Sequence, residues 1–525
     1  MSVVEYGWRR AGVVVAVMLV VLLQLADTTI VNVSLPTIDG SLGATADEGT
    51  WLITSYLIAN VIVIPLSPWL QARFGRRAYF AVSIAGFTLF SALCGFANDL
   101  NSEIVLRFVQ GAFGGGLLTP AQHILRDTYP PEQLGKSQAL FGLAVPVGPT
   151  IGPILGGYLT DNLSWQWIFF VNVLPGIAAL GLVLWILRDP ETPKAMSFDA
   201  IGIGLLTISL GSLLYVLERG ERLDWFDDPG IVFFTVLALG GSAAFGWWEL
   251  WGTKFPAVNL RVMKQRPVWL GTLAFFGHSF AFYGMFILQP LYTQQAMHFT
   301  TSLSGNFMAL RALAVLATYP IVAWLIANPR IDMRVVVAVS TVLYAATWWW
   351  QAQLMTTTAD FAAFIPSQVA GGVVLGLAYM SLNVIVTRAL NPRSVAASMA
   401  LVRLGTQISG AVGSAVIITF IDRLSAAHMA TLQETTTLAY GAIRTFVEQH
   451  GSTANSLLWA LVNAQADVLS DADAARLLAV VLLVCAPLPL LIGRAPAPLA
   501  APEFQPVRAV GDDAAYVDGR SLRLK

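Results

Sequence analysis

An acidic residue stands inside the first long apolar run of the sequence, which extends from Ala11 to about Val33. Such a run is long enough to cross a bilayer as an α-helix at ~1.5 Å per residue. A carboxylate at that depth normally faces a cavity or a charged partner and marks a path for ions or protons. We therefore predict that Asp27 is a functional residue on such a path. The alternative is a structural acid that caps the helix end, although Asn32 and Pro36 suffice to end the helix.

An arginine occupies a comparable place in the fourth apolar run. Arg107 follows Glu103 by one helical turn. The distribution of charge among the loops predicts that this helix enters the membrane from the outer side. Arg107 then lies at about the depth of Asp27, where an acid and a guanidinium can pair. Because separating such a pair raises the proton affinity of its acid, the pair can couple proton binding to a conformational change. The alternative is a static ion pair.

The composition is that of a polytopic membrane protein. Of the 525 residues, 56% are hydrophobic and 12% are charged, and the mean hydropathy is +0.67. Soluble domains carry about twice that charged fraction. We expect an all-α protein with about fourteen spans. The two cysteines, Cys94 and Cys485, lie in apolar runs, so neither a disulfide scaffold nor a cysteine metal site is expected.

Charge in the loops predicts the orientation of the chain. Lysine and arginine gather in alternate loops, which fits the positive-inside rule with both termini in the cytoplasm. The first run is too long for a signal peptide and is read as a retained span. The polar stretch 422–475 is placed outside and contains helix-like pieces, whereas the tail 494–525 is predicted to be disordered.

Two charged loop segments are candidates for a cytoplasmic gate. Between the second and third spans the sequence places Gly75, which permits a tight turn, among three arginines that can bond carbonyls or facing acids. The alternative is ordinary positive-inside charge. The predicted gate residues of both segments are Arg73, Gly75, Arg76, Arg77, Asp332 and Arg334.

The fifth span combines glycines with prolines. Gly148, Gly152 and Gly156 recur every fourth residue, which favours close packing against another helix. Prolines in the same span weaken its hydrogen bonds and permit bending. The predicted conformational motif comprises Pro146, Gly148, Pro149, Gly152, Pro153, Gly156 and Gly157.

These motifs together resemble the fourteen-span drug:proton antiporters of the major facilitator superfamily, of the EmrB/QacA type. The similarity covers nearly the whole chain and is strongest from Ala11 to Gly176. It is carried by Leu25 to Pro36 in the first span, by Arg107, Gln110, Gly111 and Gly114 in the fourth, and by Gly148, Pro149, Gly152, Gly156 and Gly157 in the fifth. The chain departs from the family at Pro68 and Ala72, where a glycine and an acid are usual, and this puts the gate's charge relay in doubt.

The resemblance implies a fold and a mechanism. The fold is two six-helix bundles, 1–190 and 267–493, with two inserted spans and a linker at 191–266 and the outer loop at 422–475. Asp27 would carry protons inward while a lipophilic substrate moves outward, with the proton gradient as energy source and no cofactor. The location implied is the bacterial inner membrane, among membrane lipids. Relatives of the EmrB branch work with a periplasmic adaptor and an outer-membrane channel.

Polar residues within the spans are weaker candidates for the wall of a substrate cavity. They are Asn32, Gln110, His278, Gln289 and Arg311. His278 titrates near neutrality when unperturbed, but a packing histidine is about as common. The amides are more often contacts between helices.

Other functions have less support in the sequence. A proton-coupled exporter of one metabolite, such as a siderophore or a fatty acid, is the main alternative. The motif of the fifth span argues against an importer. The 5 histidines are scattered and form no catalytic cluster, which disfavours a membrane enzyme. A sensor would usually carry a soluble signalling domain, and the sequence shows none. The sequence contains no glycine-rich phosphate-binding loop followed by lysine, so ATP-driven transport is disfavoured. No nucleic-acid partner is expected.

Overall fold

Long helices account for the structure, a computed structural model that describes residues 5–49, 51–130, 133–188, 199–254, 256–328, 330–390, 395–436, 441–450 and 454–493. Thirteen of its helical stretches are long and apolar enough to cross a membrane. A further helix of 29 residues, α7 (Leu134–Asn162), takes the fifth place in chain order. With it the described helices match the fourteen predicted spans. The tail 494–525 and the linker residues 189–198 lie outside the described residues.

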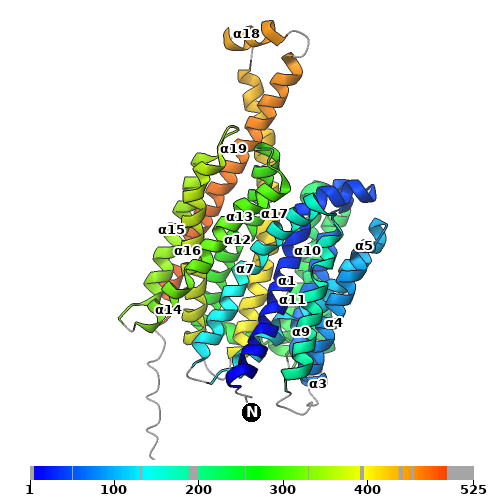
Figure 1. Ribbon diagram of the computed structural model, residues 1–525, viewed down its shortest axis with the longest axis vertical. Helices are drawn as coiled ribbons and strands as arrows, with labels where there is room; N and C mark the ends of the chain where they lie inside the picture. Colours follow the sequence, from blue (N-terminus) through cyan, green and yellow to red (C-terminus); the bar gives the residue numbers. More distant parts are fainter. Residues whose placement is uncertain are drawn as a thin grey trace, which may run out of the picture. The chain divides into compact units, whose positions relative to one another are not determined.

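The helices of the amino-terminal part pack mainly on one another (Figure 1). Its spans are α1 (Gly7–Leu42), α3 (Trp51–Phe74), α4 (Arg76–Cys94), α5 (Leu100–Gly115) with α6 (Leu118–Thr128), α7, and α8 (Trp167–Phe170) with α9 (Val173–Ile186). Helix α1 continues through Asn32 and Pro36 to Leu42, so the expectation that these two residues end it is wrong. The short α2 (Ala46–Gly49) follows α1. Helix α1 packs against α7 and α9, and α5 packs against α3 and α4. The helix that carries Asp27 and the helix that carries Arg107 therefore belong to one packed group.

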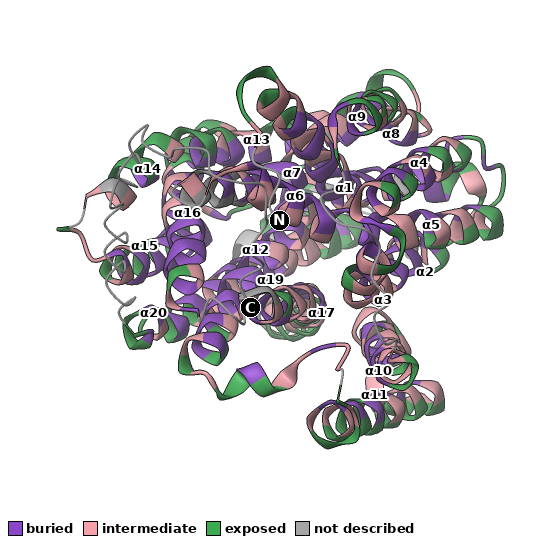
Figure 2. Cartoon of the chain, turned by 90° about the horizontal axis from the view of Figure 1, so that it is seen from below, coloured by how far each residue is buried: buried purple, intermediate pink, exposed green. Residues whose placement is uncertain are grey.

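The carboxyl-terminal part repeats this kind of packing. Its helices are α12 (Arg266–Leu291), α13 (Thr301–Ala317) with α14 (Tyr319–Ala327), α15 (Met333–Leu354), α16 (Phe361–Ala389), α17 (Val395–Thr435), α19 (Ala454–Cys485) and α20 (Leu488–Leu491). Helix α12 packs against α17, and α15 packs against α16 and α19. Helices α10 (Ala200–Arg219) and α11 (Pro229–Trp247) pack against each other. Of the two, α10 also contacts α3 and α17 (Figure 2).

Buried apolar side chains divide along similar lines. Two apolar clusters consist of residues between Val13 and Ile186. The third consists, apart from Val61, of residues between Leu206 and Ile492. Figure 2 shows buried positions where helices face one another and exposed positions on the outer faces. Many of these exposed residues are large and apolar, as expected of surfaces that contact lipid.

Helices α17 and α19 continue past the ends of the other helices (Figure 1). They carry the short helix α18 (Gly441–His450) between them, so most of the stretch 422–475 is helical. We call this side of the molecule the α18 end, and the side at which α1 begins the amino-terminal end.

Helix α1 approaches α7 closely at a glycine of α7, and it donates a hydrogen bond to a backbone carbonyl of α7 that lacks its usual donor within its own helix. A Cβ atom built at Gly152 would lie 2.6 Å from the carbonyl oxygen of Ala26, so only glycine permits this approach. Pro153 has no N–H to offer the carbonyl four residues earlier, and the Thr29 hydroxyl donates to that carbonyl, Pro149 O, at 2.7 Å. The proline that weakens α7 thus creates an acceptor that α1 satisfies. The side chain of Pro146 lies outside the described residues.

This close approach predicts the effect of one methyl group. Gly152→Ala should lower the free energy of unfolding by about 1–3 kcal/mol, because the helices must separate to admit the Cβ atom. The control is Gly181→Ala in α9, where an added Cβ would meet nothing within 4 Å. Thermal unfolding of the two purified variants measures the difference. Equal stability of both variants would contradict the packing described here.

Candidate functional site

Asp27 and Arg107 meet inside the amino-terminal group of helices. The Asp27 side chain is 0% exposed and that of Arg107 is 1% exposed. Arg107 Nη1 donates to Asp27 Oδ2 at 2.8 Å, so the predicted ion pair is present in the structure. Two charges removed from water are tolerated only when they are paired and their remaining hydrogen-bonding capacity is satisfied.

Two amides complete the shell of the carboxylate. Gln110 Nε2 donates to Asp27 Oδ1 at 3.1 Å, and Asn172 Nδ2 donates to the same oxygen at 2.8 Å. Arg107 Nη1 also donates to Gln110 Oε1 at 2.8 Å, which fixes the orientation of that amide. Asn172 is held in turn by a bond to Ser91 Oγ at 3.1 Å. The Asp27 carboxylate is thus held by donors from α5 and from the residue preceding α9.

The guanidinium of Arg107 is enclosed on its other sides as well. Its Nε donates to the carbonyl oxygen of Leu52 at 3.3 Å, and its Cζ lies 4.2 Å from the centre of the Tyr56 ring. The Phe169 ring lies 5.6 Å away. Aromatic faces attract a cation electrostatically, so α3 and α8 help to stabilise the charge.

Sequence reasoning did not identify several members of this site. Asn172 and Ser91 are polar side chains in apolar runs. Through the packing of α4 and α9, Asn172 becomes a partner of Asp27 and Ser91 becomes a partner of Asn172. Glu103, read as a loop acid, is in fact fully buried, and neither of its carboxylate oxygens has a hydrogen-bond partner. A four-residue spacing to Arg107 was the one signal in the sequence for it.

The gate residues predicted in the first of the two segments lie around the junction of α3 and α4. Gly75 joins the two helices with a φ of 87°, a conformation that favours glycine. Arg76 Nη1 pairs with Asp127 Oδ2 of α6 at 2.5 Å, and Arg77 donates to the carbonyl oxygen of Leu184. Arg73 is exposed. Arg76 therefore has an acidic partner in Asp127, which sequence reasoning missed.

The second gate segment lies at the start of α15. Arg334 Nη2 pairs with Asp332 Oδ2 at 2.6 Å, and Arg334 Nη1 donates to the carbonyl oxygen of Ile492 at 3.2 Å. The charged residues of this segment therefore tie α15 to the end of the described chain.

The polar candidates of the carboxyl-terminal part are separate from Asp27 and are buried among their own neighbours. His278 Nδ1 lies 2.9 Å from the carbonyl oxygen of Ala274 and its Nε2 lies 3.0 Å from Thr341 Oγ1. Gln289 Nε2 donates to Gln351 Oε1 at 3.5 Å. His278 and Gln289 are thus engaged between helices in this conformation.

Arg311 is the buried cation of this part of the molecule. Its Nε donates to Gln368 Oε1 at 2.8 Å, and its Cζ lies 4.7 Å from the centre of the Trp348 ring. Its Nη2 is buried without a hydrogen-bond partner. Asn32 in α1 likewise has a buried Oδ1 with no partner.

A cavity of about 520 Å³ opens elsewhere, towards the amino-terminal end, between α3 and α6 on one side and α16 and α17 on the other. Residues 256–259 close a third side. Its lining is mostly apolar and includes Arg126, Arg388, Arg403 and His123, and no aspartate or glutamate is among the described residues that line it. None of the five predicted cavity residues belongs to this lining.

Comparison with known proteins agrees with this architecture. Residues 17–414 match the Major Facilitator Superfamily. The multidrug export protein EmrB of Escherichia coli (strain K12) is 34% identical over 429 residues, which cover 82% of this chain and 83% of the relative. The fatty acid resistance protein FarB of Neisseria gonorrhoeae is 33% identical and covers 80% of this chain and 83% of its own length.

Solved structures show the same fold at low sequence identity. A bacterial homologue of the human lysosomal transporter Spinster, in an inward-facing and unoccupied conformation, superposes with a TM-score of 0.55 at 15% identity. The alignment covers 94% of this chain and 100% of that one. By its sequence match, its spans and its relatives, the chain belongs to the Major Facilitator Superfamily as a multi-pass transporter of the EmrB multidrug-export type and is not an enzyme.

Proposed function

We propose that this transporter exports lipophilic small molecules in exchange for protons, with Asp27 as the proton site and Arg107 as its partner. The observation that carries the proposal is the buried Asp27–Arg107 pair with its amide shell. Removing one partner of a buried ion pair costs about 3–5 kcal/mol, because the other charge is left buried and uncompensated. Protonation of Asp27 removes one charge, so Arg107 must then find another partner and the helices around it must adjust.

The proposed cycle is alternating access between two six-helix bundles, 1–190 and 267–493. The cavity of about 520 Å³ lies between helices of both parts near the amino-terminal end. At the opposite end, Asp161 Oδ2 of α7 accepts hydrogen bonds from Ser302 N at 3.0 Å and from Ser302 Oγ at 2.6 Å. These contacts support a state that is closed at the α18 end and ready to accept substrate from the other side.

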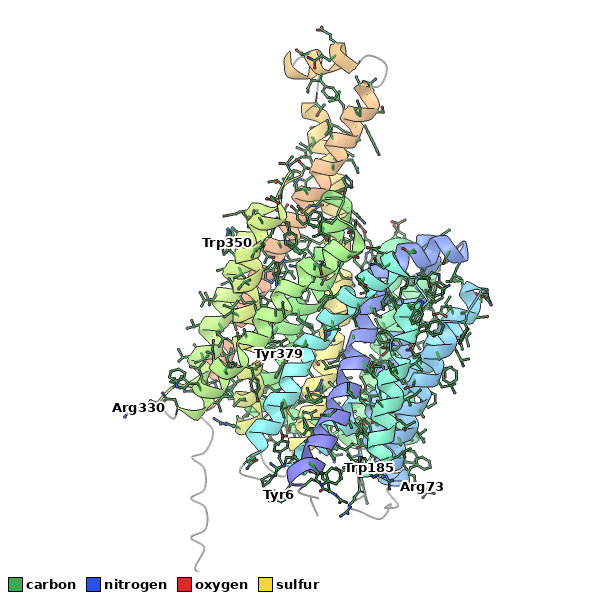
Figure 3. The ribbon with its side chains drawn as sticks, in the orientation of Figure 1. Tyr6, Arg73, Trp185, Arg330, Trp350 and Tyr379 are labelled. Atoms are coloured by element: carbon green, nitrogen blue, oxygen red, sulfur yellow. The ribbon has the colours of Figure 1, made fainter. Side chains whose placement is uncertain are left out.

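We propose that both termini are cytoplasmic, so that the cavity faces the cytoplasm. Arg73 and Arg330 lie at the same end as Tyr6, and Trp350 lies nearer to the α18 end (Figure 3). Clustered arginines mark the cytoplasmic face of bacterial membrane proteins. Substrate would then enter from the cytoplasm or the inner leaflet, and protons from the α18 end.

A periplasmic adaptor is the partner that we propose at the α18 end. The extension of α17 and α19 reaches beyond the other helices and carries α18. In its α19 part the apolar side chains of Leu457, Trp459 and Leu461 are exposed. Exposed apolar residues on a projecting helix suit a protein partner, here one that continues the export path to an outer-membrane channel.

The cavity lining favours an anionic amphiphile over a cation as the substrate. Arg126, Arg388 and Arg403 line it without a facing acid among the described residues, and its remaining wall is largely apolar. A lipophilic anion would meet apolar surface and guanidinium groups together. The same observation favours a fatty-acid-like metabolite as the second candidate substrate.

Substitution of Asp27 tests the coupling directly. In inverted vesicles with an acid lumen, a substrate of the wild type should drive proton efflux, and Asp27→Asn should abolish it, because the amide cannot carry a proton. The measurement is lumenal pH after addition of a panel of lipophilic anions and cations. Asp228→Asn is the matched control, since Asp228 caps α11 and asparagine caps a helix equally well. Undiminished exchange by Asp27→Asn would show that coupling lies elsewhere.

Charge preference can be measured with two probes of equal shape. Tetraphenylborate should bind the purified protein at least about tenfold more tightly than tetraphenylphosphonium, a difference of about 1.4 kcal/mol. Arg126→Gln should reduce that ratio, whereas Arg330→Gln, which removes the same charge outside the cavity lining, should leave it unchanged. Titration calorimetry in detergent gives both affinities. Tighter binding of the cation would contradict the proposed substrate class.

A further inference from the structure

Glu103 is a buried carboxyl group that the site described so far does not use. It stands in the first turn of α5 and is 0% exposed. Within the part of the chain that the structure describes, neither Oε1 nor Oε2 has a hydrogen-bond partner of normal geometry. An ionised carboxylate without donors in such surroundings costs several kcal/mol, whereas the neutral acid is tolerated.

Among the described residues, Arg107 is the one cation that acts on Glu103. The flanking residues Leu100 and Ile104 pack against an apolar cluster that contains Leu52 and Cys94. The ionisable groups that act on Glu103 are Arg107 from its own helix, the Cys94 thiol from α4 and Asp27 from α1. From α3, Tyr56 faces the same guanidinium.

Two buried carboxyl groups, those of Asp27 and Glu103, thus lie near the guanidinium of Arg107. Asp27 accepts hydrogen bonds from Arg107, Gln110 and Asn172, whereas no described residue donates to Glu103 with normal hydrogen-bond geometry and the Cys94 thiol is its nearby weak donor. Arg107 can neutralise one carboxylate at a time. In the conformation described here that carboxylate is Asp27. A neutral, protonated Glu103 would leave no buried carboxylate without a counter-charge.

We propose that Glu103 is a second proton-binding site, which shares the guanidinium of Arg107 with Asp27. Residues four apart on an α-helix lie on one face with Cβ atoms about 5–6 Å apart, and a glutamate that precedes an arginine by four residues is well placed to pair with it. When Asp27 takes up a proton, Arg107 is released and turns to Glu103.

The exchange keeps atoms and charge in balance. The O–H bond of the Glu103 carboxyl breaks and an O–H bond forms on an Asp27 oxygen. The guanidinium then neutralises the new Glu103 carboxylate instead of that of Asp27. The three groups carry the same total charge before and after, so the apolar interior never holds an unpaired ion.

The position of Glu103 gives the second site a direction. Helix α3 ends near Arg73 at the amino-terminal end, and α4 then leads to the opposite end, where α5 begins (Figures 1 and 3). Glu103 therefore lies nearer to the α18 end than Arg107 does. The inference rests on the proton coupling proposed above, in which protons enter from that end and would reach Glu103 before Asp27.

Infrared difference spectroscopy of the purified protein tests the proposal without substrate or gradient. A protonated carboxyl has a carbonyl-stretch band that a carboxylate and an amide lack. At neutral pH, Glu103→Gln should lose one component of this band relative to the wild type. Asp27→Asn should lose the same component, because Arg107, freed from its carboxylate, pairs with Glu103 and displaces its proton.

Two further variants serve as controls. Glu103→Asp should retain a protonated-carboxyl component, so that the loss in Glu103→Gln reports the acid and not misfolding. Glu249→Gln removes an equally buried carboxyl that follows α11 and should leave the Glu103 component in place. A wild-type band that Glu103→Gln does not change would overturn the second proton site. A Glu103 component that persists in Asp27→Asn would overturn the shared arginine.

Because no transport is measured, these outcomes are separate from those of the vesicle assay. Exchange that survives Asp27→Asn would defeat the proposed function, whereas an unchanged infrared band would defeat only the role of Glu103.

Discussion

The exclusion of water from the amino-terminal helices is the constraint on which the site depends. Inside such packing a charge is stable only beside its counter-charge and its hydrogen-bond partners. Asp27 and Arg107 meet that requirement with a 2.8 Å ion pair and donors from Gln110 and Asn172. In the proposed mechanism, a change in the protonation of Asp27 acts on the contacts that it makes with α5 and with Asn172 before α9.

Helix α7 can transmit such a change to the other half of the molecule. It packs along α1, which carries Asp27, and also against α13 and α16 of the carboxyl-terminal part. The glycines that allow close approach leave little room for independent movement, and the proline that frees the Pro149 carbonyl is compensated from α1 by Thr29. In the proposed cycle, a displacement of α1 would move α7 with it and so act on the contact between Asp161 and Ser302 at the α18 end.

The sequence predicted what depends on local pattern and on depth in the membrane. The spans follow from apolar runs, and the Asp27–Arg107 pair follows from two charges at one depth. Asn172 and Asp127 could not be identified in this way, because the sequence does not say which polar side chain the packing turns toward a charge. The five polar residues expected in a cavity were chosen for their type alone, and the cavity that the structure contains is lined by others.

The most direct test of the account is whether protonation of Asp27 changes the conformation. Spin labels on cysteines introduced at the exposed Asn162 of α7 and Leu303 of α13 would report the distance across the α18 end, while the native Cys94 and Cys485 are buried. We expect this distance to increase in the wild type as the pH falls, and to be independent of pH in Asp27→Asn. The same pH dependence in both proteins would contradict the central role of Asp27.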